Sequence, residues 1–240
     1  MLFMALLLHG PLLVQASACG VNTVWRVSFG ETPGLTEPGK KSTLIEFIEN
    51  MTVGAGIDLQ YQVVPFKRSL ISVSAGHADM HVPLLQSDDN LLIDENLMYS
   101  EASFFEVPFN VYMEADSEIS GSDIWSGGEL IETDAAHTHF FPFSVTGSHC
   151  MECSLRKLVR GRIDAYIYAE VTTERTIKKL DFGHKIRREF YKTFPVKAVL
   201  PRNECGEELN RKLNSLVPAA RRATTNPTFR AKPKTPELSN

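Results

Sequence analysis

The feature that most constrains the fold is a phrase that the chain contains twice. The segment "LISVSAGHADMHVPLL", residues 70–85, aligns without a gap with "LRKLVRGRIDAYIYAE", residues 155–170. Gly76 falls on Gly161, 85 residues later (161 minus 76), and the Asp three residues further on is also shared. Each copy has the pattern of a helix, a glycine that ends it, and a buried strand. The chain is therefore expected to contain two similar α/β lobes.

The repeated phrase belongs to a longer alternation of strand and helix patterns. A β-α-β-α-β order is expected over 23–30, 42–51, 57–66, 67–76 and 78–85. The second copy predicts a helix over 150–161 with Ser148 as N-cap, then a strand over 163–170, a helix over 172–181, a strand over 194–201 and a helix over 206–217. Alternating elements predict a parallel sheet covered by helices. Ligands of such sheets bind beyond the carboxyl ends of the strands, here 83–86 and 168–170.

The N-terminus indicates export. Residues 1–18 are mostly apolar and end in Ala-Ser-Ala, as a signal peptide does before its cleavage site, so we expect a periplasmic protein. No later apolar run approaches the ~20 residues that span a bilayer. Cys19 follows the expected cleavage site and raises the alternative of a lipid anchor, but Ala16 stands where a lipobox carries a large aliphatic residue. The tail over 224–240 is rich in Thr, Pro and Lys and is expected to be disordered.

Four segments together resemble the extracellular solute-binding proteins of family 3. They are "VVPFKRSLISVSAGHAD", "MYSEASFFEVPFNVYM", "LRKLVRGRIDAYIYAE" and "EELNRKLNSL", in this order. The resemblance implies the type II periplasmic-binding-protein fold, an α/β fold of two Rossmann-like lobes with mixed, mostly parallel sheets joined by two crossovers. Lobe one would comprise 19–107 and 194–223, and lobe two 108–193. The family captures a small molecule between the lobes for an ABC-type membrane transporter or a sensor subunit.

Two contacts that amino-acid binders of this family use are absent. The Arg expected about a dozen residues beyond the lobe-one Asp is missing from "QSDDNLLID", and Ala169 takes the place of the Asp that receives the ammonium group. Glu170 and Arg68 are candidate substitutes. We therefore expect a small polar ligand other than a standard α-amino acid.

The strand ends and the resemblance nominate ten ligand-binding residues, six from lobe one and four from lobe two. They are Glu31, Thr32, Phe66, Arg68, Gln86, Ser87, Thr138, His139, Tyr168 and Glu170.

Charge is distributed unevenly along the chain. Between Ser69 and Leu155 there is no Lys or Arg, while Asp and Glu number fifteen. One interpretation is a field that attracts a cationic ligand such as a polyamine, a quaternary amine or a metal ion. The other is an acidic face that opposes a basic face elsewhere on the same molecule. We favour the second.

Cysteine and histidine residues near position 150 raise two alternative functions. "CMEC" at the expected start of a helix suggests a periplasmic thiol-redox protein using Cys150 and Cys153. His137, His139 and His149 nearby suggest zinc or copper binding. Export permits disulfides without fixing which pairs form.

Neither alternative is favoured over solute binding. A single CxxC lacks the second pair typical of metal sites, and no Trp precedes the first Cys. No Gly-x-Ser-x-Gly, HExxH or phosphate-loop motif occurs. We expect a monomeric binding protein with no enzyme activity, cofactor, dedicated metal site or nucleic-acid partner.

Overall fold

The computed structural model describes residues 21, 23–32, 35–87 and 94–230. The expected signal peptide, Cys19 and residues 231–240 of the tail expected to be disordered lie outside the described residues. Within the described part of the chain, no helix combines the length and the apolar character needed to cross a membrane.

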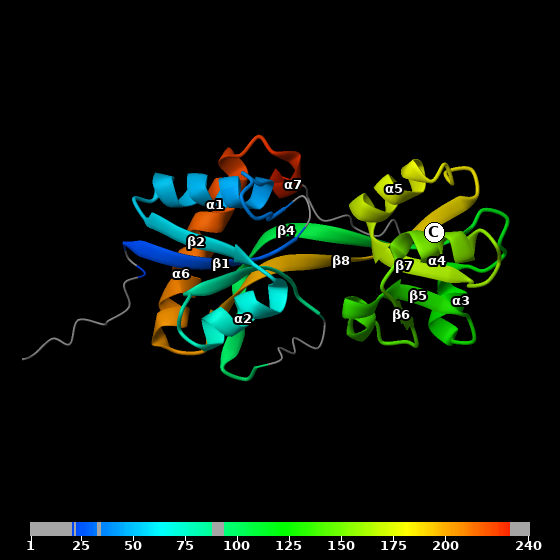
Figure 1. Ribbon diagram of the computed structural model, residues 1–240, viewed down its shortest axis with the longest axis horizontal. Helices are drawn as coiled ribbons and strands as arrows, with labels where there is room; N and C mark the ends of the chain where they lie inside the picture. The colour runs from blue at the N-terminus through cyan, green and yellow to red at the C-terminus, as the bar shows by residue number, and fades with distance from the viewer. Residues whose placement is uncertain (1–20, 22, 33–34, 88–93, 231–240) are drawn as a thin grey trace, which may run out of the picture.

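The strands of the described residues form one eight-stranded sheet with the order β2-β1-β3-β8-β4-β7-β5-β6 (Figure 1). The strands are β1 (Val24–Gly30), β2 (Asp58–Val64), β3 (Met80–Leu85), β4 (Leu97–Glu114), β5 (Ile131–Asp134), β6 (Thr146–Ser148), β7 (Ala165–Ala169) and β8 (Ile186–Pro201). β1 runs parallel to β2 and β3, and β5 runs parallel to β6 and β7. Each half therefore holds three parallel strands in the same spatial order, second-first-third.

Helices cover both faces of this sheet (Figure 1). They are α1 (Thr43–Gly54), α2 (Phe66–Ser74), α3 (Gly121–Ser126), η2 (Ala135–Phe140), α4 (Met151–Leu158), α5 (Glu170–Lys179), α6 (Glu204–Ala223) and α7 (Pro227–Arg230). We use "lobe one" for β1 to β3 with α1, α2, α6 and α7, and "lobe two" for β5 to β7 with α3, η2, α4 and α5. In Figure 1 the two lobes lie side by side, lobe one on the left.

β4 and β8 are the two crossovers that join the lobes. They pair antiparallel along almost their whole length, from Leu97 opposite Pro201 to Glu114 opposite Ile186. In lobe one the third strand, β3, pairs with β8, and in lobe two the third strand, β7, pairs with β4. The two halves therefore have the same arrangement, with β8 beside the third strand of lobe one and β4 beside the third strand of lobe two. The α/β fold expected from the sequence, two lobes joined by two crossovers, is confirmed.

The repeated phrase forms the same turn in both lobes. Gly76 and Gly161 have φ of 73° and 60°, in the left-handed region that glycine adopts without strain. The Asp79 N–H donates to Arg26 O at 2.8 Å, and the Asp79 carboxylate accepts from Arg26 N at 2.8 Å. In lobe two, Asp164 N donates to Leu130 O at 2.9 Å and its carboxylate accepts from Leu130 N at 2.7 Å. Each Asp therefore clamps the start of the first strand of its lobe.

Each lobe has its own apolar core. In lobe one, α1 and α6 pack on one face of the sheet around Trp25, Phe29 and Phe104. In lobe two, Phe109 and Phe194 lie in the core of one face, while Leu155 and Tyr166 lie in the core of the other. Leu85 and Val107 contact both the large lobe-one core and the Phe109 core, so the two cores meet at the crossovers.

Three local expectations are corrected. The N-cap of α4 is Cys150, not Ser148, because Ser148 ends β6 and pairs with Asp134. β8 begins at Ile186 rather than near 194, since β4 supplies a hydrogen-bonding partner along its polar first half. The expected disorder from 224 is wrong for 224–230, where α7 forms and Phe229, 1% exposed, stacks on Phe47 at 4.2 Å.

The acidic stretch is paired with basic residues elsewhere in the molecule. Lys157 lies 2.6 Å from Glu132, and Lys179 lies 2.5 Å from Glu152. On the lobe-one side, the Arg26 guanidinium lies 2.6 Å from Asp79. These pairs support the interpretation that the acidic segment opposes basic segments of the same molecule.

Candidate functional site

The candidate site is the edge of the sheet where the parallel strands of both lobes end. β3 ends with Leu85 opposite Val196 of β8, and β7 ends with Ala169 opposite Phe109 of β4. Both ends therefore point toward the middle of the shared β4–β8 ribbon, from opposite sides. We call these converging carboxyl ends, with the residues that follow them, the ligand edge.

The register gives the separation of the two halves of the ligand edge. Gln86 N donates to Pro195 O at 2.9 Å, and Pro195 pairs with Glu106. Tyr168 pairs with Asn110 on the same strand, β4. The two attachment points are thus four residues apart (110 minus 106), or roughly 13 Å at about 3.3 Å per residue. The ends of β3 and β7 therefore approach the same stretch of β4.

In lobe one, the end of β1 is packed against a buried histidine. A Cβ at Gly30 would lie 2.7 Å from His81 Cε1 and 2.7 Å from the Phe66 ring, so a side chain has no room there. The Phe66 ring stands at 80° on the His81 ring with centroids 4.7 Å apart. Phe66 is partly exposed, which leaves part of this ring open at the ligand edge.

His81 is neutral and held by a buried serine. The Ser69 hydroxyl donates to Ser28 O at 2.7 Å and lies 2.7 Å from His81 Nδ1, so the ring Nδ1–H donates to the hydroxyl oxygen. Burial lowers the pKa of His81 to about 3. Its Nε2 atom has no hydrogen-bond partner among the described residues.

The other nominated residues of lobe one differ in exposure. Thr32 donates its hydroxyl to Gly30 O at 3.1 Å, next to the exposed Glu31. A pocket of about 310 Å³ opens beside the end of β1 and is lined by Glu31, Glu37, Pro38 and Lys40. Arg68 is exposed in the first turn of α2, Gln86 is half-buried, and Ser87 is buried.

In lobe two, three rings gather behind the ends of β5 and β7. The centroids of Phe109, His137 and Tyr168 lie 5.3–6.1 Å apart. His137 Nδ1 lies 3.2 Å from Asp134 Oδ1, and this contact holds the pKa of the Asp134 carboxyl below its usual range. Burial raises the pKa of Tyr168 to about 12. This side of the ligand edge is therefore aromatic with one partly exposed carboxylate.

The remaining nominated residues of lobe two differ in whether they are available to a ligand. Thr138 and His139 lie in η2, directly after β5, so both belong to the ligand edge, with His139 exposed. Glu170 begins α5, and its carboxylate lies 4.0 Å from Arg188 Nη2. The Glu170 carboxylate, which was a candidate to receive an ammonium group of the ligand, thus already lies near the Arg188 guanidinium.

Sequence reasoning missed two residues of the ligand edge. Asp134 ends β5, and His137 lies beside it and contacts Tyr168. The sequence shows an acidic residue followed three positions later by a histidine, but no strand was predicted over 131–134, so nothing placed this pair at a strand end. His139 was nominated instead, although its ring faces Phe140 at 4.7 Å.

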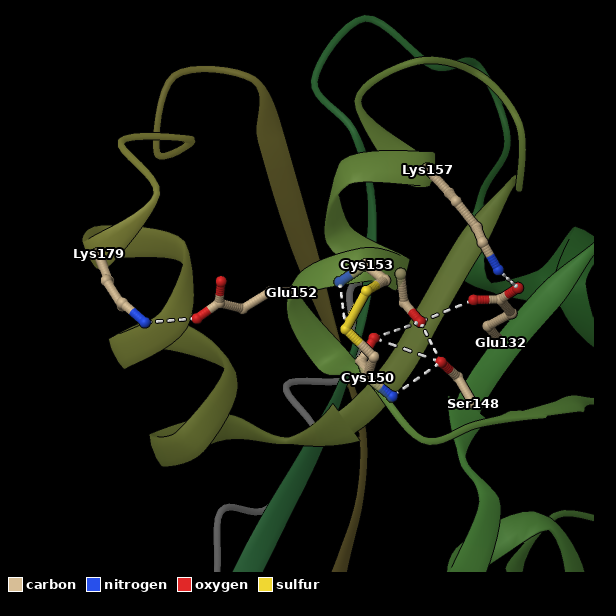
Figure 2. The surroundings of a disulfide bond; sticks show 8 residues. Glu132, Ser148, Cys150, Glu152, Cys153, Lys157 and Lys179 are labelled. Atoms are coloured by element: carbon tan, nitrogen blue, oxygen red, sulfur yellow. Dashed lines mark hydrogen bonds and ion pairs between the residues drawn. A yellow bond between two sulfur atoms is a disulfide. The ribbon is translucent and has the colours of Figure 1, made fainter.

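Cys150 and Cys153 form a disulfide at the start of α4, with Cα atoms 5.2 Å apart (Figure 2). Because β6 ends at Ser148, this turn lies at the carboxyl end of a parallel strand. Cys153 occupies the place in the repeat that Arg68 occupies in lobe one, 85 positions earlier (153 minus 68). The disulfide therefore lies on the lobe-two side of the ligand edge.

The zinc or copper alternative rests on His137, His139 and His149, and the neighbouring Cys150 and Cys153 sulfurs, bonded to each other, are not free to serve as additional ligands. Within the described ranges, no group of three or more His, Cys, Asp or Glu side chains is placed to hold a metal ion.

The fold is shared with known binding proteins. No family model matches the chain, and no curated protein sequence does. The L-cystine solute receptor of Neisseria gonorrhoeae, unliganded and open, is similar at 13% identity and a TM-score of 0.59, over 84% of this chain and 89% of that one. The GluR0 ligand-binding core of Nostoc punctiforme, in complex with L-glutamate, is similar at 13% identity and 0.56, over 85% and 100%.

A histidine kinase sensor domain with similarity to periplasmic binding proteins is also similar, at 12% identity and a TM-score of 0.60, over 84% of this chain and 91% of that one. These likenesses confirm the type II periplasmic-binding-protein fold that the sequence predicted.

Proposed function

We propose that this chain, on the premise of its type II periplasmic-binding-protein fold, is an exported monomeric binding protein. It captures a small polar solute between its lobes and presents it to an ABC-type transporter or a sensor in the membrane. The boundaries proposed for its units are 1–18 for the signal peptide, 19–107 with 194–223 for lobe one, to which α7 adds the residues up to Arg230, and 108–193 for lobe two. The protein works by binding and closure, without catalysis or a cofactor.

The observation that carries this proposal is the convergence of the two strand ends on one ribbon. A ligand placed beside the middle of β4 and β8 can contact Gln86 from lobe one and Tyr168 from lobe two. Because β4 and β8 carry the chain from one lobe to the other in the described residues, small changes in those strands alter the distance between the lobes. A solute that contacts both sides therefore favours a closed form.

The chemistry of the ligand edge argues against a standard α-amino acid. Recognition of an α-carboxylate is best served by the planar fork of an Arg, and the region after Asp79 that would supply it reads "QSDDNLLID". The end of β7 carries Ala169, and Glu170 lies beside Arg188. A solute with a polar group for Gln86 and a flat apolar portion for Phe66 fits these residues better.

A thermal-shift screen tests the proposal directly. The panel contains polyamines, quaternary amines, amino acids, sugars and organic anions. A solute at a hundred times its Kd stabilises the folded state by about 2.7 kcal/mol, which corresponds to roughly 5–10 °C in Tm for a chain of this size. We expect one class to give such a shift, and no shift from any class would contradict the proposal.

Matched variants locate the binding site. Gln86→Ala and Thr138→Val each remove one polar group from one side of the ligand edge, and both should weaken binding of the best solute at least tenfold. Glu46→Gln, on the exposed face of α1, is the control and should bind as the unaltered protein does. If neither ligand-edge variant weakens binding, the solute binds elsewhere.

A further inference from the structure

We propose that the Cys150–Cys153 disulfide is a site of thiol–disulfide exchange with small thiols, in which the thiol attacks Cys153 and Cys150 leaves as the thiolate. This activity is additional to solute binding and is measured on protein without any solute. The failure of one proposal therefore leaves the other standing.

The position of Cys150 favours it as the leaving group. Cys150 is the N-cap of α4, and its Sγ accepts a hydrogen bond from the Cys153 N–H at 3.2 Å (Figure 2). The N–H groups of the first helical turn have no carbonyl partner within the helix, and the N-terminus carries a partial positive charge. A thiolate at this place is therefore stabilised, and a sulfur whose thiolate is stabilised leaves faster.

Exposure favours Cys153 as the sulfur that is attacked. Cys153 is exposed, whereas Cys150 is half-buried. The attacking sulfur must approach in line with the bond that breaks, so it needs open space beside the sulfur it attacks. The exposure of Cys153 and the stability of the Cys150 thiolate thus favour the same reaction, in which Cys153 is attacked and Cys150 leaves.

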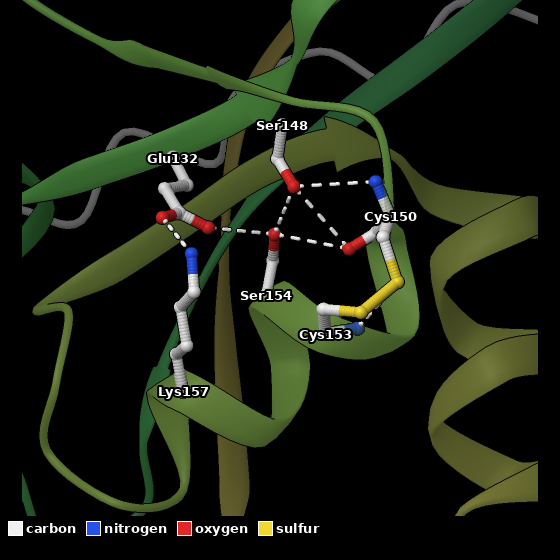
Figure 3. A network of polar contacts seen from close by, with 6 residues as sticks. All are labelled: Glu132, Ser148, Cys150, Cys153, Ser154 and Lys157. Atoms are coloured by element: carbon white, nitrogen blue, oxygen red, sulfur yellow. Dashed lines mark hydrogen bonds and ion pairs between the residues drawn. A yellow bond between two sulfur atoms is a disulfide. The ribbon is translucent and has the colours of Figure 1, made fainter.

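A polar network holds the main chain of Cys150 without using the disulfide (Figure 3). Cys150 N donates to Ser148 Oγ at 3.3 Å, and the Ser148 and Ser154 hydroxyls lie 2.9 Å apart. Ser154 Oγ donates to Glu132 Oε2 at 2.7 Å, and Lys157 Nζ lies 2.6 Å from the other carboxylate oxygen. The turn is therefore anchored to β5 and α4 by side chains, and we expect it to keep its shape after reduction.

Another cysteine of the chain provides an internal comparison. Cys205 lies in the first turn of α6 and is also in a disulfide, whose partner lies outside the described residues. The N-cap there is Asn203, whose side-chain oxygen accepts from Gly206 N at 3.0 Å. Unlike Cys150, Cys205 is not the N-cap of its helix, because the side chain of Asn203 fills that position.

The reaction balances with two thiols per disulfide. The first thiolate attacks Cys153 Sγ, a mixed disulfide forms on Cys153, the protein S–S bond breaks, and the electron pair goes to Cys150 Sγ. A second thiolate attacks the thiol-derived sulfur of the mixed disulfide and releases the Cys153 thiolate. The protein disulfide is reduced to two thiols, and the two small thiols are oxidised to their disulfide.

The experiment uses the oxidised protein with reduced glutathione as the probe. Samples are quenched with acid at intervals, alkylated and mapped by peptide mass spectrometry. We expect Cys150–Cys153 to open at least tenfold faster than the disulfide of Cys205, with glutathione on Cys153 and the alkyl group on Cys150. Equal opening rates would overturn the proposal, and so would glutathione found mainly on Cys150.

Single-cysteine variants test the same claim without the disulfide. In Cys153→Ser the Cys150 thiol keeps its N-cap place, and in Cys150→Ser the Cys153 thiol stands alone. The pH dependence of iodoacetamide labelling should give Cys150 an apparent pKa at least one pH unit below that of Cys153. A Cys150 value equal to or above that of Cys153 would contradict the role of Cys150 as leaving group. The melting temperature of each variant confirms that it is folded.

Discussion

Lobe one and lobe two contain the same turn between a helix and a strand, but they differ in the polar groups buried between that helix and the sheet. Gly76 N and Gly161 N each donate to the carbonyl three residues before, at 3.0 Å, and the Asp that follows each glycine clamps the neighbouring strand. The repeat is therefore explained by the geometry needed to pass from a helix into a strand. This turn lies at the opposite end of the strands from the ligand edge.

The difference between the lobes lies in buried groups at equivalent positions. Ser69 and Ser154 occupy the same place in the repeat, and both are fully buried. Ser69 bonds Ser28 O and the neutral His81, whereas Ser154 bonds the carboxylate of Glu132. Lobe one is thus built on an uncharged pair, and lobe two on a charged network that includes the disulfide turn.

This contrast shows at which equivalent positions the two lobes differ. The turn before the third strand has the same Gly and Asp in both lobes, while the helix starts at the ligand edge carry Phe66 and Arg68 in one lobe and Met151 and Cys153 in the other. Functional differences are therefore expected at the ligand edge.

The largest expected effect comes from removing the charge in lobe two. Glu132→Ala removes the carboxylate that accepts from Ser154 at 2.7 Å and from Lys157 at 2.6 Å, and we expect a loss of about 2–3 kcal/mol in the free energy of unfolding. The side chain of Lys157 is 42% exposed and can be hydrated, which keeps the loss below that of a fully buried pair. Ser28→Ala, at the equivalent place in lobe one, removes only the hydroxyl that accepts from Gln62 Nε2 at 3.3 Å and leaves the Ser69 hydrogen bond to Ser28 O in place, so it should cost about 1 kcal/mol. Urea unfolding measures both, and equal losses would remove the contrast.

Next in size is the loss of the shared clamp. Asp79→Ala and Asp164→Ala each remove the acceptor of a strand N–H, and each should cost about 2 kcal/mol. Asp79→Ala should cost slightly more, because the Arg26 guanidinium also loses its partner. Chemical denaturation tests this pair, and a loss confined to one lobe would show that the two turns are not equivalent.

The glycines should respond equally and less strongly. Gly76→Ala and Gly161→Ala place a Cβ on left-handed backbone, which costs about 1–2 kcal/mol each. Gly54→Ala is the matched control, since nothing lies within 4 Å of a Cβ at that position and its φ is ordinary. We expect the control to stay within about 0.5 kcal/mol of the unaltered protein. A clear difference between the Gly76 and Gly161 variants would break the comparison.

The smallest expected effect is a pH dependence specific to lobe one. Burial lowers the folded-state pKa of His81 to about 3 from 6.5, so the unfolded chain binds the proton first and stability falls as pH falls below 6.5. Between pH 6.5 and 5.5 this amounts to about 1 kcal/mol. His81→Gln should lose less stability over this interval than the unaltered protein.

The exposed His184 supplies the control for that experiment. His184→Gln should follow the pH curve of the unaltered protein. If His81→Gln also follows that curve, His81 is not held neutral by burial.

Short sequence patterns predicted the helices and strands of the repeat well, because the residues that define its turn are close together in the sequence. The glycine that ends a helix and the Asp that starts a strand lie within a few residues of each other, so one sequence shows them. Long-range pairings were not predictable. The polar start of β8 becomes a strand because β4 lies beside it. Residues 224–230 are held against lobe one because Phe229 stacks on Phe47. Glu170 looked available, and only the fold brings Arg188 to it.

Hydrogen–deuterium exchange with and without the solute that raises Tm most tests the central claim most directly. We predict slower exchange of the amides around residues 84–87 and around 166–170 together, because one solute contacts the strand ends of both lobes. Protection confined to one lobe, or to the turns at Asp79 and Asp164, would contradict the claim that the two halves share a ligand.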